Sequence, residues 1–211
     1  NIDNSILINP DASYVIAIYG TSTMNITNSE VKSTRNTYTA VAWRPIIIVE
    51  GESSKGSTLN ISGGKVTGSN APAIFVANYA AVNISGGAVI FSQNAIITDL
   101  GFTYERKPGA IYMEKGGSVT IADATVSNNF TNEGVGSYAI FAGENAGSRQ
   151  TTFIIRKGTT ILQGSYLATN LAPTLRPGLQ GKASSNNNGT GLTNYDETQI
   201  GSYKYLEFKP I

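Results

Sequence analysis

The chain has 211 residues, 14% of them charged, a formal net charge of +1, and neither cysteine nor histidine. The near-neutral charge excludes the basic surface typical of nucleic-acid-binding domains, and no apolar run is long enough to predict a membrane-spanning helix. The missing cysteine and histidine exclude disulfides, thiolate or imidazole metal sites, and catalysis by Cys-His or Ser-His-Asp groups.

Along the chain, the first repeated phrase places two branched aliphatic residues five positions apart, with polar or small residues between them. Its copies are NITNSEV, NISGGKV, NISGGAV and TIADATV, with the pairs Ile26 and Val31, Ile61 and Val66, Ile84 and Val89, and Ile121 and Val126. A looser fifth copy, FIIRKGTTIL, contains Ile155 and Ile161. In each copy the middle residues suit a bend between two short strands.

A second phrase, Ala-Ile followed by Tyr or Phe, precedes most copies of the first. It begins at Ala17, Ala73, Ala110 and Ala139. Together the phrases predict one coil of a right-handed parallel β-helix, in which like residues of successive coils stack about 4.8 Å apart. No window has a sustained helical period, so the chain is predicted to be all-β. A two-sheet sandwich is the alternative, but its strands need not resemble one another.

The glycine pair of NISGG occurs twice, at residues 60–64 and 83–87. We expect these glycines at a corner between two sheets, where they supply a positive φ or a close backbone approach. Replacing Gly64 or Gly87 is therefore predicted to destabilise the corner.

Three polar or glycine-bearing segments interrupt the repeat, at residues 50–57, 98–109 and 143–150. We expect them to be loops on the flank of the solenoid and to carry any local function. The rhythm breaks near the end of the chain. We predict β-helix coils over residues 1–164 and a loop-rich cap over residues 165–211, with a last strand at Tyr203–Pro210.

The stretches LNISGGKVTGSNAPAIFVANYAAVNISGGAV and PGAIYMEKGGSVTIADATVSNN resemble right-handed parallel β-helix modules of bacterial surface proteins. Autotransporter passengers and pectate-lyase-like adhesin domains are such proteins. The resemblance covers roughly Ile18 to Gly164, and the tail is similar to the segment that closes β-helix regions in secreted proteins of Gram-positive gut bacteria. It implies an extracellular or cell-surface location. The opening NIDNSILINP, without Met, is interpreted as the start of a mature or excised fragment.

The acidic residues are the remaining candidates for chemistry. β-Helix enzymes acting on polysaccharides, which the pattern also resembles, use clustered carboxylates as acid and base or as Ca²⁺ ligands. The nearest groupings here are Glu50 with Glu52, the set Asp99, Glu105, Arg106 and Lys107, and Asp196 with Glu197. None has a paired spacing on successive coils, so we predict no catalytic residue, metal or cofactor. A polysaccharide lyase or glycoside hydrolase remains an alternative.

The aromatic residue of each Ala-Ile phrase is a candidate ligand-binding residue. If Ile18, Ile74, Ile111 and Ile140 face inward, the next ring in each strand faces outward, because side chains alternate. These rings are Tyr19, Phe75, Tyr112 and Phe141. An exposed column of rings suits sugars or a partner protein, whereas rings that are covered by the insertions, or that face inward, belong to a core.

Tyr104 and Arg106, in the loop at residues 98–109, complete the candidate binding residues. The single tryptophan, Trp43, is predicted to pack in the early coils. We therefore expect a non-catalytic adhesion or glycan-recognition module, a monomer within a larger chain, that binds a glycan or surface protein. A passive structural stalk is a further alternative.

Overall fold

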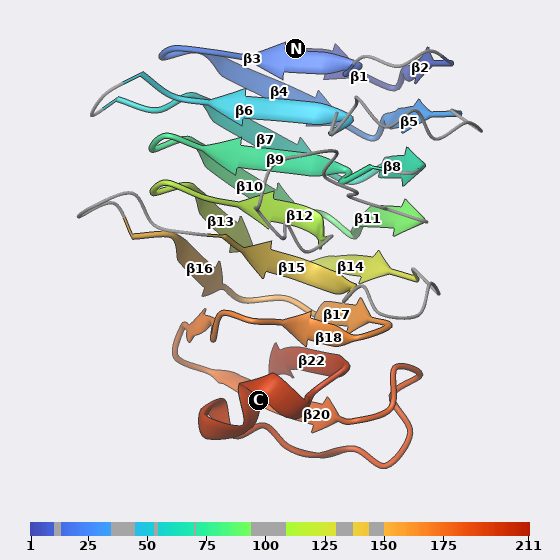
Figure 1. Ribbon diagram of the computed structural model, residues 1–211, viewed down its shortest axis with the longest axis vertical. Helices are drawn as coiled ribbons and strands as arrows, with labels where there is room; N and C mark the ends of the chain where they lie inside the picture. The colour runs from blue at the N-terminus through green and yellow to red at the C-terminus, as the bar shows by residue number, and fades with distance from the viewer. Residues whose placement is uncertain are drawn as a thin grey trace, which may run out of the picture.

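The computed structural model describes residues 1–10, 14–34, 45–52, 55–69, 71–93, 109–129, 137–143 and 150–211. These residues form a parallel β-helix, as predicted, in which the chain visits three sheets in turn and returns one layer further along the axis. Figure 1 shows the coils stacked from the N-terminal end at the top to the C-terminal end at the bottom.

All strands of sheet A are parallel. This sheet contains the first aliphatic residue of each predicted pair, namely Ile26, Ile61, Ile84 and Ile121. In order, its strands are β1 (Ile2–Asp3), β4 (Thr23–Thr27), β7 (Thr58–Ser62), β10 (Ala81–Ser85), β13 (Ser118–Ile121), β16 (Thr152–Ile155) and β19 (Thr174–Leu175).

Sheet B follows sheet A in each coil and ends in antiparallel strands. Its parallel strands are β2 (Ile6–Asn9), β5 (Glu30–Ser33), β8 (Lys65–Ser69), β11 (Ala88–Gln93), β14 (Ala124–Asn128) and β17 (Thr160–Gly164). The antiparallel strands are β22 (Tyr205–Pro210), β20 (Leu179–Ser184) and β21 (Thr193–Asn194).

Sheet C holds the Ala-Ile phrases. Its parallel strands are β3 (Ile16–Ile18), β6 (Ile47–Glu50), β9 (Ile74–Ala77), β12 (Gly109–Met113), β15 (Tyr138–Ala142) and β18 (Leu167–Thr169). A 3₁₀ helix, η1 (Glu197–Ser202), lies in the cap, and the Asp196 carboxylate accepts hydrogen bonds from the Thr198 backbone N–H and hydroxyl.

The core consists of files of like side chains that run along the axis. In sheet A, Ile61 lies over Ile84, as the repeat predicts. The full file is Ile2, Ile26, Ile61, Ile84, Ile121, Ile155 and Leu175. Burying each isoleucine contributes roughly 1.5–3 kcal/mol, so short strands that are marginal alone become stable when stacked.

The second aliphatic residue of each predicted pair lies in sheet B, and its predicted position is correct in three coils and wrong in two. Val66 pairs with Ile90, not with Val89, because the corner before β11 has one residue more than the corner before β8. The fifth copy is likewise displaced, since Leu162 pairs with Val126 and Ile161 faces outward. Among the parallel strands the file is Leu7, Val31, Val66, Ile90, Val126 and Leu162, and it continues to Leu206 of β22.

The first coil of sheet C is shifted by two residues from the predicted alignment. Ile16, and not Ile18, heads the file of Ile47, Ile74, Ile111 and Ile140. Ile18 pairs instead with Val49. Both Ile16 and Ile18 face inward and are buried, so a shift of two leaves the inward pattern unchanged.

The cap closes the C-terminal end of sheet B, and the predicted last strand is present as β22. Leu206 and Phe208 of this strand are fully buried and pair with Leu162 and Thr160 of β17. The reversal to antiparallel pairing interrupts the repeat at this end.

Candidate functional site

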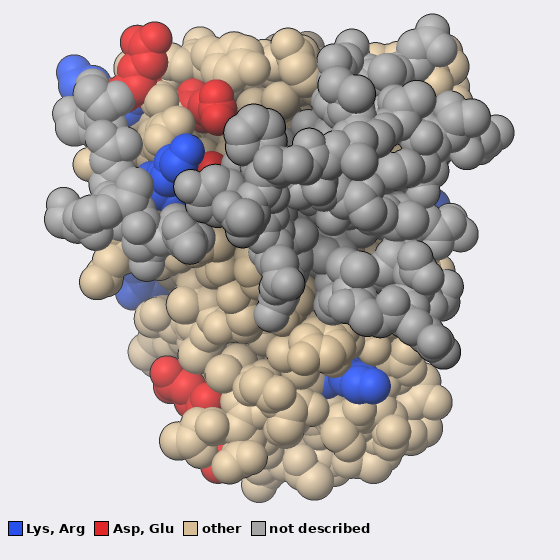
Figure 2. All heavy atoms as spheres, in the orientation of Figure 1, with Lys and Arg blue, Asp and Glu red and all other residues tan. Residues whose placement is uncertain are grey.

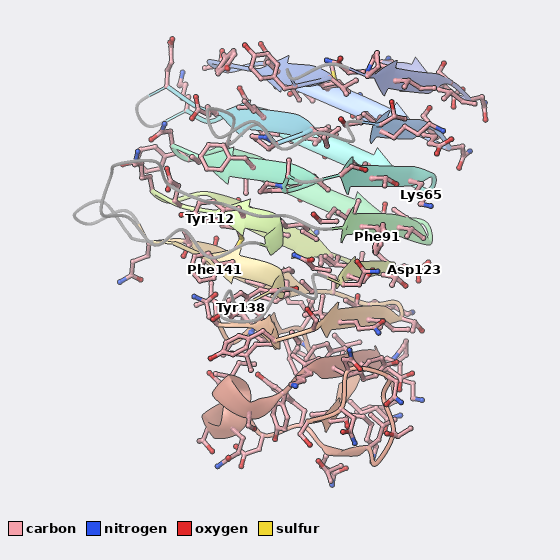
Figure 3. The ribbon with its side chains drawn as sticks, turned by 45° about the vertical axis from the view of Figure 1, so that its right-hand side comes forward. Lys65, Phe91, Tyr112, Asp123, Tyr138 and Phe141 are labelled. Carbon is pink, nitrogen blue, oxygen red and sulfur yellow. The ribbon has the colours of Figure 1, made fainter. Side chains whose placement is uncertain are left out.

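A column of aromatic rings runs along the outer face of sheet C. Three of its rings are those that the spacing of the Ala-Ile phrases predicts. Phe75 stacks on Tyr112 with ring centroids 5.7 Å apart, and Tyr112 contacts Phe141 at 5.5 Å. Two further rings that the sequence analysis missed extend the column, Tyr138 at 4.9 Å from Phe141 and Tyr166 at 5.6 Å from Tyr138. Figure 3 shows Tyr112, Phe141 and Tyr138 one below another.

Much of this column is covered. Phe75 and Tyr112 are each only 3% exposed and form a second small hydrophobic cluster, against which Ile48 and Phe141 pack. The Tyr112 hydroxyl donates to Glu114 Oε2 at 3.3 Å. The interpretation of these two rings as a satellite core therefore agrees with their burial, and only Tyr166, 51% exposed, presents a large open ring at one end.

Tyr19 does not belong to the column, which corrects the predicted alignment. The position of the first coil above Ile48 and Phe75 is Ala17, because β3 is shifted by two residues. Tyr19 follows the end of β3 and is 49% exposed. Tyr104 and Arg106, and Trp43, lie outside the described residues, as do Asp99, Glu105 and Lys107.

Tyr19 instead lies at the turn from sheet C to sheet A. We define the C–A corner as residues 19–20, 50–52, 78–79 and 114–115, which follow or end β3, β6, β9 and β12. Backbone bonds hold these turns together, since Gly51 N donates to Ala77 O at 3.3 Å and Glu114 N donates to Val76 O at 3.0 Å. The Ser57 hydroxyl contacts both Gly20 O and Glu50 O, at 3.1 and 3.0 Å.

The C–A corner combines exposed aromatic rings with charged groups. Tyr14 is 42% exposed and interacts electrostatically with Tyr19, which in turn interacts with Glu50. Tyr79, two coils further along, is 38% exposed. Figure 2 shows acidic and basic side chains gathered at the upper left of the molecule, over the ends of the sheet C strands.

Tyr79 has an unusual backbone conformation. It follows Asn78 in the turn after β9, and both residues have positive φ, 53° for Asn78 and 63° for Tyr79. A bulky side chain in this region costs roughly 1–2 kcal/mol, whereas glycine or asparagine adopts it readily. Strained residues of this kind are concentrated at functional sites.

Burial and neighbouring charges act on the Glu50 carboxyl at the corner. Burial raises the pKa of Glu50 above its ordinary value; the Lys115 ammonium opposes this rise, and the Glu114 carboxylate adds to it. Glu114 is 8% exposed, accepts the Tyr112 hydroxyl and forms an ion pair with Lys115 at 3.3 Å. Burial, followed by Tyr14 and Glu50, also raises the pKa of Tyr19.

The remaining acidic grouping that the structure describes, Asp196 with Glu197, lies at the start of η1. Asp196 caps η1. Among the described residues, no three His, Cys, Asp or Glu side chains are arranged to hold a metal ion.

The sequence analysis did not single out Tyr79 or Glu114. Tyr79 occurs in a two-residue turn between strands, where glycine or asparagine is the usual choice, and this mismatch is the signal that identifies it. Glu114 is remote from Glu50 in sequence and approaches it only because the coils stack.

In the part of the chain that the structure describes, no helix has the length and apolarity needed to cross a membrane. Comparisons with protein-family models, with curated proteins and with solved structures find no match to this chain.

Proposed function

We propose that this protein is a non-catalytic carbohydrate-recognition module of a secreted or cell-surface protein, and that its contact surface is the C–A corner. The observation that carries the proposal is the pair of exposed tyrosines at this corner, Tyr19 and Tyr79, with Tyr14 and the Glu50 carboxylate beside Tyr19. The extracellular location rests on the resemblance to bacterial surface modules.

The chemistry of the corner matches that of a sugar. A tyrosine ring offers an apolar face for the C–H side of a pyranose and a hydroxyl for its polar edge. A carboxylate accepts hydrogen bonds from sugar hydroxyls, and such charge-assisted bonds are stronger than neutral ones. Because the corner carries the carboxylates of Glu50 and Glu114 beside the single ammonium of Lys115, we expect a neutral oligosaccharide and not a strongly acidic one.

The conformation of Tyr79 supports a role in binding. The ring is 38% exposed and its residue has a φ of 63°, so a bulky side chain is held at the surface in a backbone conformation that costs free energy. Retaining a tyrosine there at a cost in stability is expected if the ring serves recognition.

The coils provide a rigid support for the rings. Tyr19 and Tyr79 follow strands whose register is set by parallel pairing on sheet C, so their separation along the axis is fixed by stacking. Rings held in this way lose little conformational freedom on binding, which favours affinity for an extended ligand.

A glycan array of neutral and acidic oligosaccharides, followed by calorimetry with the strongest neutral ligand, tests the proposal. We expect Tyr19→Ser and Tyr79→Asn each to weaken binding about tenfold, the equivalent of one aromatic contact. Tyr79→Asn should keep or raise the melting temperature, because asparagine tolerates the positive φ. Tyr166→Ser is the matched control, since it removes an equally exposed ring elsewhere.

The proposal is wrong if no neutral glycan binds, or if Tyr166→Ser weakens binding as much as the corner variants do. Absence of all binding and turnover would favour the passive stalk.

One observation favours a second candidate, a glycoside hydrolase. Glu50, with its raised pKa, lies near Glu114, and a pair of carboxyls with different environments is the arrangement that acid–base hydrolysis requires. Release of reducing ends from the bound oligosaccharide, abolished by Glu50→Gln, would support the hydrolase. Binding without release would support the recognition module.

A further inference from the structure

The loop that joins β20 to β21 contains the single Asn-Gly pair of the sequence, Asn188 and Gly189. The side-chain amide of an asparagine can be attacked by the backbone nitrogen of the next residue, and glycine hinders this attack least because it has no side chain. Asn188 is exposed, so water also reaches the amide. The loop therefore places an electrophilic carbon beside an unhindered nitrogen at the surface of the cap.

Ser184 anchors this loop at both ends. Its side chain is buried, with the residue only 3% exposed. The Ser184 hydroxyl accepts a hydrogen bond from the Asn186 backbone N–H at 3.0 Å and donates one to the Thr190 carbonyl. The segment from 186 to 190 is thus closed over one buried group. Holding two reacting groups in a fixed arrangement lowers the entropic part of a reaction barrier.

Thr190 contacts the carbonyl oxygen of the amide. Asn188 Oδ1 accepts hydrogen bonds from the Thr190 backbone N–H at 3.1 Å and from the Thr190 hydroxyl at 2.8 Å. The first of these bonds folds the side chain over the backbone that follows it, as in an Asx turn. When a nitrogen attacks Asn188 Cγ, negative charge develops on Oδ1, and two donors already aimed at this atom stabilise that charge.

Gly189 can supply the attacking nitrogen. Its backbone N–H donates to Asn186 O at 3.3 Å, which is longer than the usual range for such a bond, so its loss costs little. Gly189 also has a φ of 73°, which glycine adopts readily. A Cβ at this position would lie 3.0 Å from Tyr205 Cζ, so the Tyr205 ring and the positive φ both favour glycine here.

Other asparagines of the chain lie in a setting that opposes the same reaction. Asn25, Asn60 and Asn83 form an asparagine ladder on the outer face of sheet A, in which Asn83 donates to Asn60 and Asn60 to Asn25, each at 2.8 Å. Each is followed by isoleucine within a paired strand. The branched side chain shields the backbone nitrogen that would attack, and strand pairing fixes its position. We therefore expect Asn188 to react before the ladder residues.

We infer that Asn188 is a site of spontaneous deamidation, which the folded loop promotes. A bond forms between Gly189 N and Asn188 Cγ while the Cγ–Nδ2 bond breaks. The amide nitrogen leaves as ammonia and takes the proton of Gly189 N. Water then opens the resulting succinimide at either of the two C–N bonds of its ring nitrogen to a carbonyl carbon, which gives aspartate or isoaspartate at position 188.

The product changes the cap. Both products carry a negative charge where the amide was neutral, and isoaspartate adds a methylene group to the backbone of the loop. Gly189 lies against the Tyr205 ring of β22, so the longer backbone displaces the loop from this strand. We expect amide hydrogen exchange in the loop at residues 185–192 to become at least about tenfold faster in the isoaspartate form. The modification would act as a slow, one-way change in the cap.

Incubation at pH 8 followed by peptide mass spectrometry and isoaspartate detection tests the inference. We expect exchange of the Asn188 amide group for a hydroxyl, at a rate in the folded protein no lower than in the chain unfolded in urea. Thr190→Ala should slow the reaction about fivefold, because one of the two donors to Oδ1 is lost. Thr190→Ser keeps the hydroxyl and should react like the parent.

Two control variants complete the experiment. Asn188→Gln should abolish the product at this loop. Thr193→Ala removes a nearby hydroxyl that donates to Ala183 O at 3.3 Å, leaves the contacts of Asn188 in place and should not change the rate. The inference is overturned if the folded chain reacts more slowly than the unfolded chain, or if the product forms first at the ladder residues. It is also overturned if Thr190→Ala reacts as fast as the parent.

Discussion

Gly64 and Gly87 end the same phrase, yet a side chain would meet different surroundings at the two positions. Both have positive φ, 76° and 73°. A Cβ on Gly64 would overlap the Ser29 backbone of the preceding coil, whereas one on Gly87 meets nothing within 4 Å. Gly87 belongs to the corner that has one extra residue, which moves it away from the neighbouring coil.

We therefore expect Gly64→Ala to destabilise the fold by roughly 3–4 kcal/mol and Gly87→Ala by only about 1 kcal/mol, the cost of the left-handed backbone. Urea unfolding of the two variants and the parent measures the difference, and Gly87→Ala is the matched control for φ alone. If both variants lost the same free energy of unfolding, the backbone near Ser29 would have moved to accommodate the new Cβ without cost.

Glu50 should make stability depend on pH. Because its folded-state pKa is raised, the folded protein binds this proton more tightly than the unfolded chain. The resulting stabilisation is complete below the ordinary value of 4.5 and is lost as the pH rises through the folded-state pKa. Glu50→Gln removes the charge that burial disfavours.

We expect Glu50→Gln to melt at a higher temperature than the parent at pH 7, and the gap to close below pH 4.5. Thermal melts of both proteins from pH 3.5 to 8 measure it. A gap that stays constant over this range would mean that the substitution acts through packing and not through ionisation.

At the scale of the element, the asparagine ladder is a test of how the coils are tied together on their outer face. Asn60 donates to Asn25 and accepts from Asn83, both at 2.8 Å. We expect Asn60→Ala to cost about 1–2 kcal/mol, because two exposed hydrogen bonds are lost. Thr58→Ala is the control, since Thr58 lies on the same face of β7 and its neighbour in β10 is already Ala81.

Denaturant unfolding of the two variants checks this expectation. If Asn60→Ala and Thr58→Ala lowered the free energy of unfolding by the same small amount, hydrogen bonds to water would satisfy the Asn side chains as well as the ladder does.

The strands and inner files could be predicted from sequence because each coil must place an aliphatic side chain over the one below. Ile26, Ile61, Ile84 and Ile121 follow this rule closely enough to reveal it. The shift at Ile16 and Ile18 could not be predicted, because a displacement of two residues preserves the inward pattern. The extra residue before β11 was hidden in the same way, since Val89 and Ile90 are both suitable core residues.

The candidate site was harder to predict than the fold. The Ala-Ile phrase singled out Tyr19, but the neighbours of Tyr19 depend on the turns that follow each sheet C strand. Tyr79 is distinguished by its positive φ, which the residue type alone does not predict. The burial of Phe75 and Tyr112 depends on what covers the outer face, a property of tertiary packing.

At the scale of the whole molecule, the two ends of the β-helix are built differently. In the described residues the first coil contributes a parallel strand to each of the three sheets, whereas β22 and β20 reverse direction at the other end of sheet B. Sheet B therefore cannot continue the parallel repeat beyond β17, whereas sheets A and C end there in the parallel strands β19 and β18. The cap should therefore act as the barrier to self-association at the C-terminal end.

Deleting residues 203–211 removes β22 and with it Leu206 and Phe208, both fully buried. This exposes the β17 edge and the Leu162 side chain, so we expect a melting temperature at least about 10 °C lower and concentration-dependent association. Light scattering and thermal melts from low to high micromolar concentration measure both effects. Deletion of Ile211 alone is the control; it removes an exposed side chain and one backbone hydrogen bond, from Ile211 N to Gly178 O at 3.1 Å, and should change both measurements little. A truncated chain that stayed monomeric and melted like the parent would mean that β20 and η1 close this end without β22.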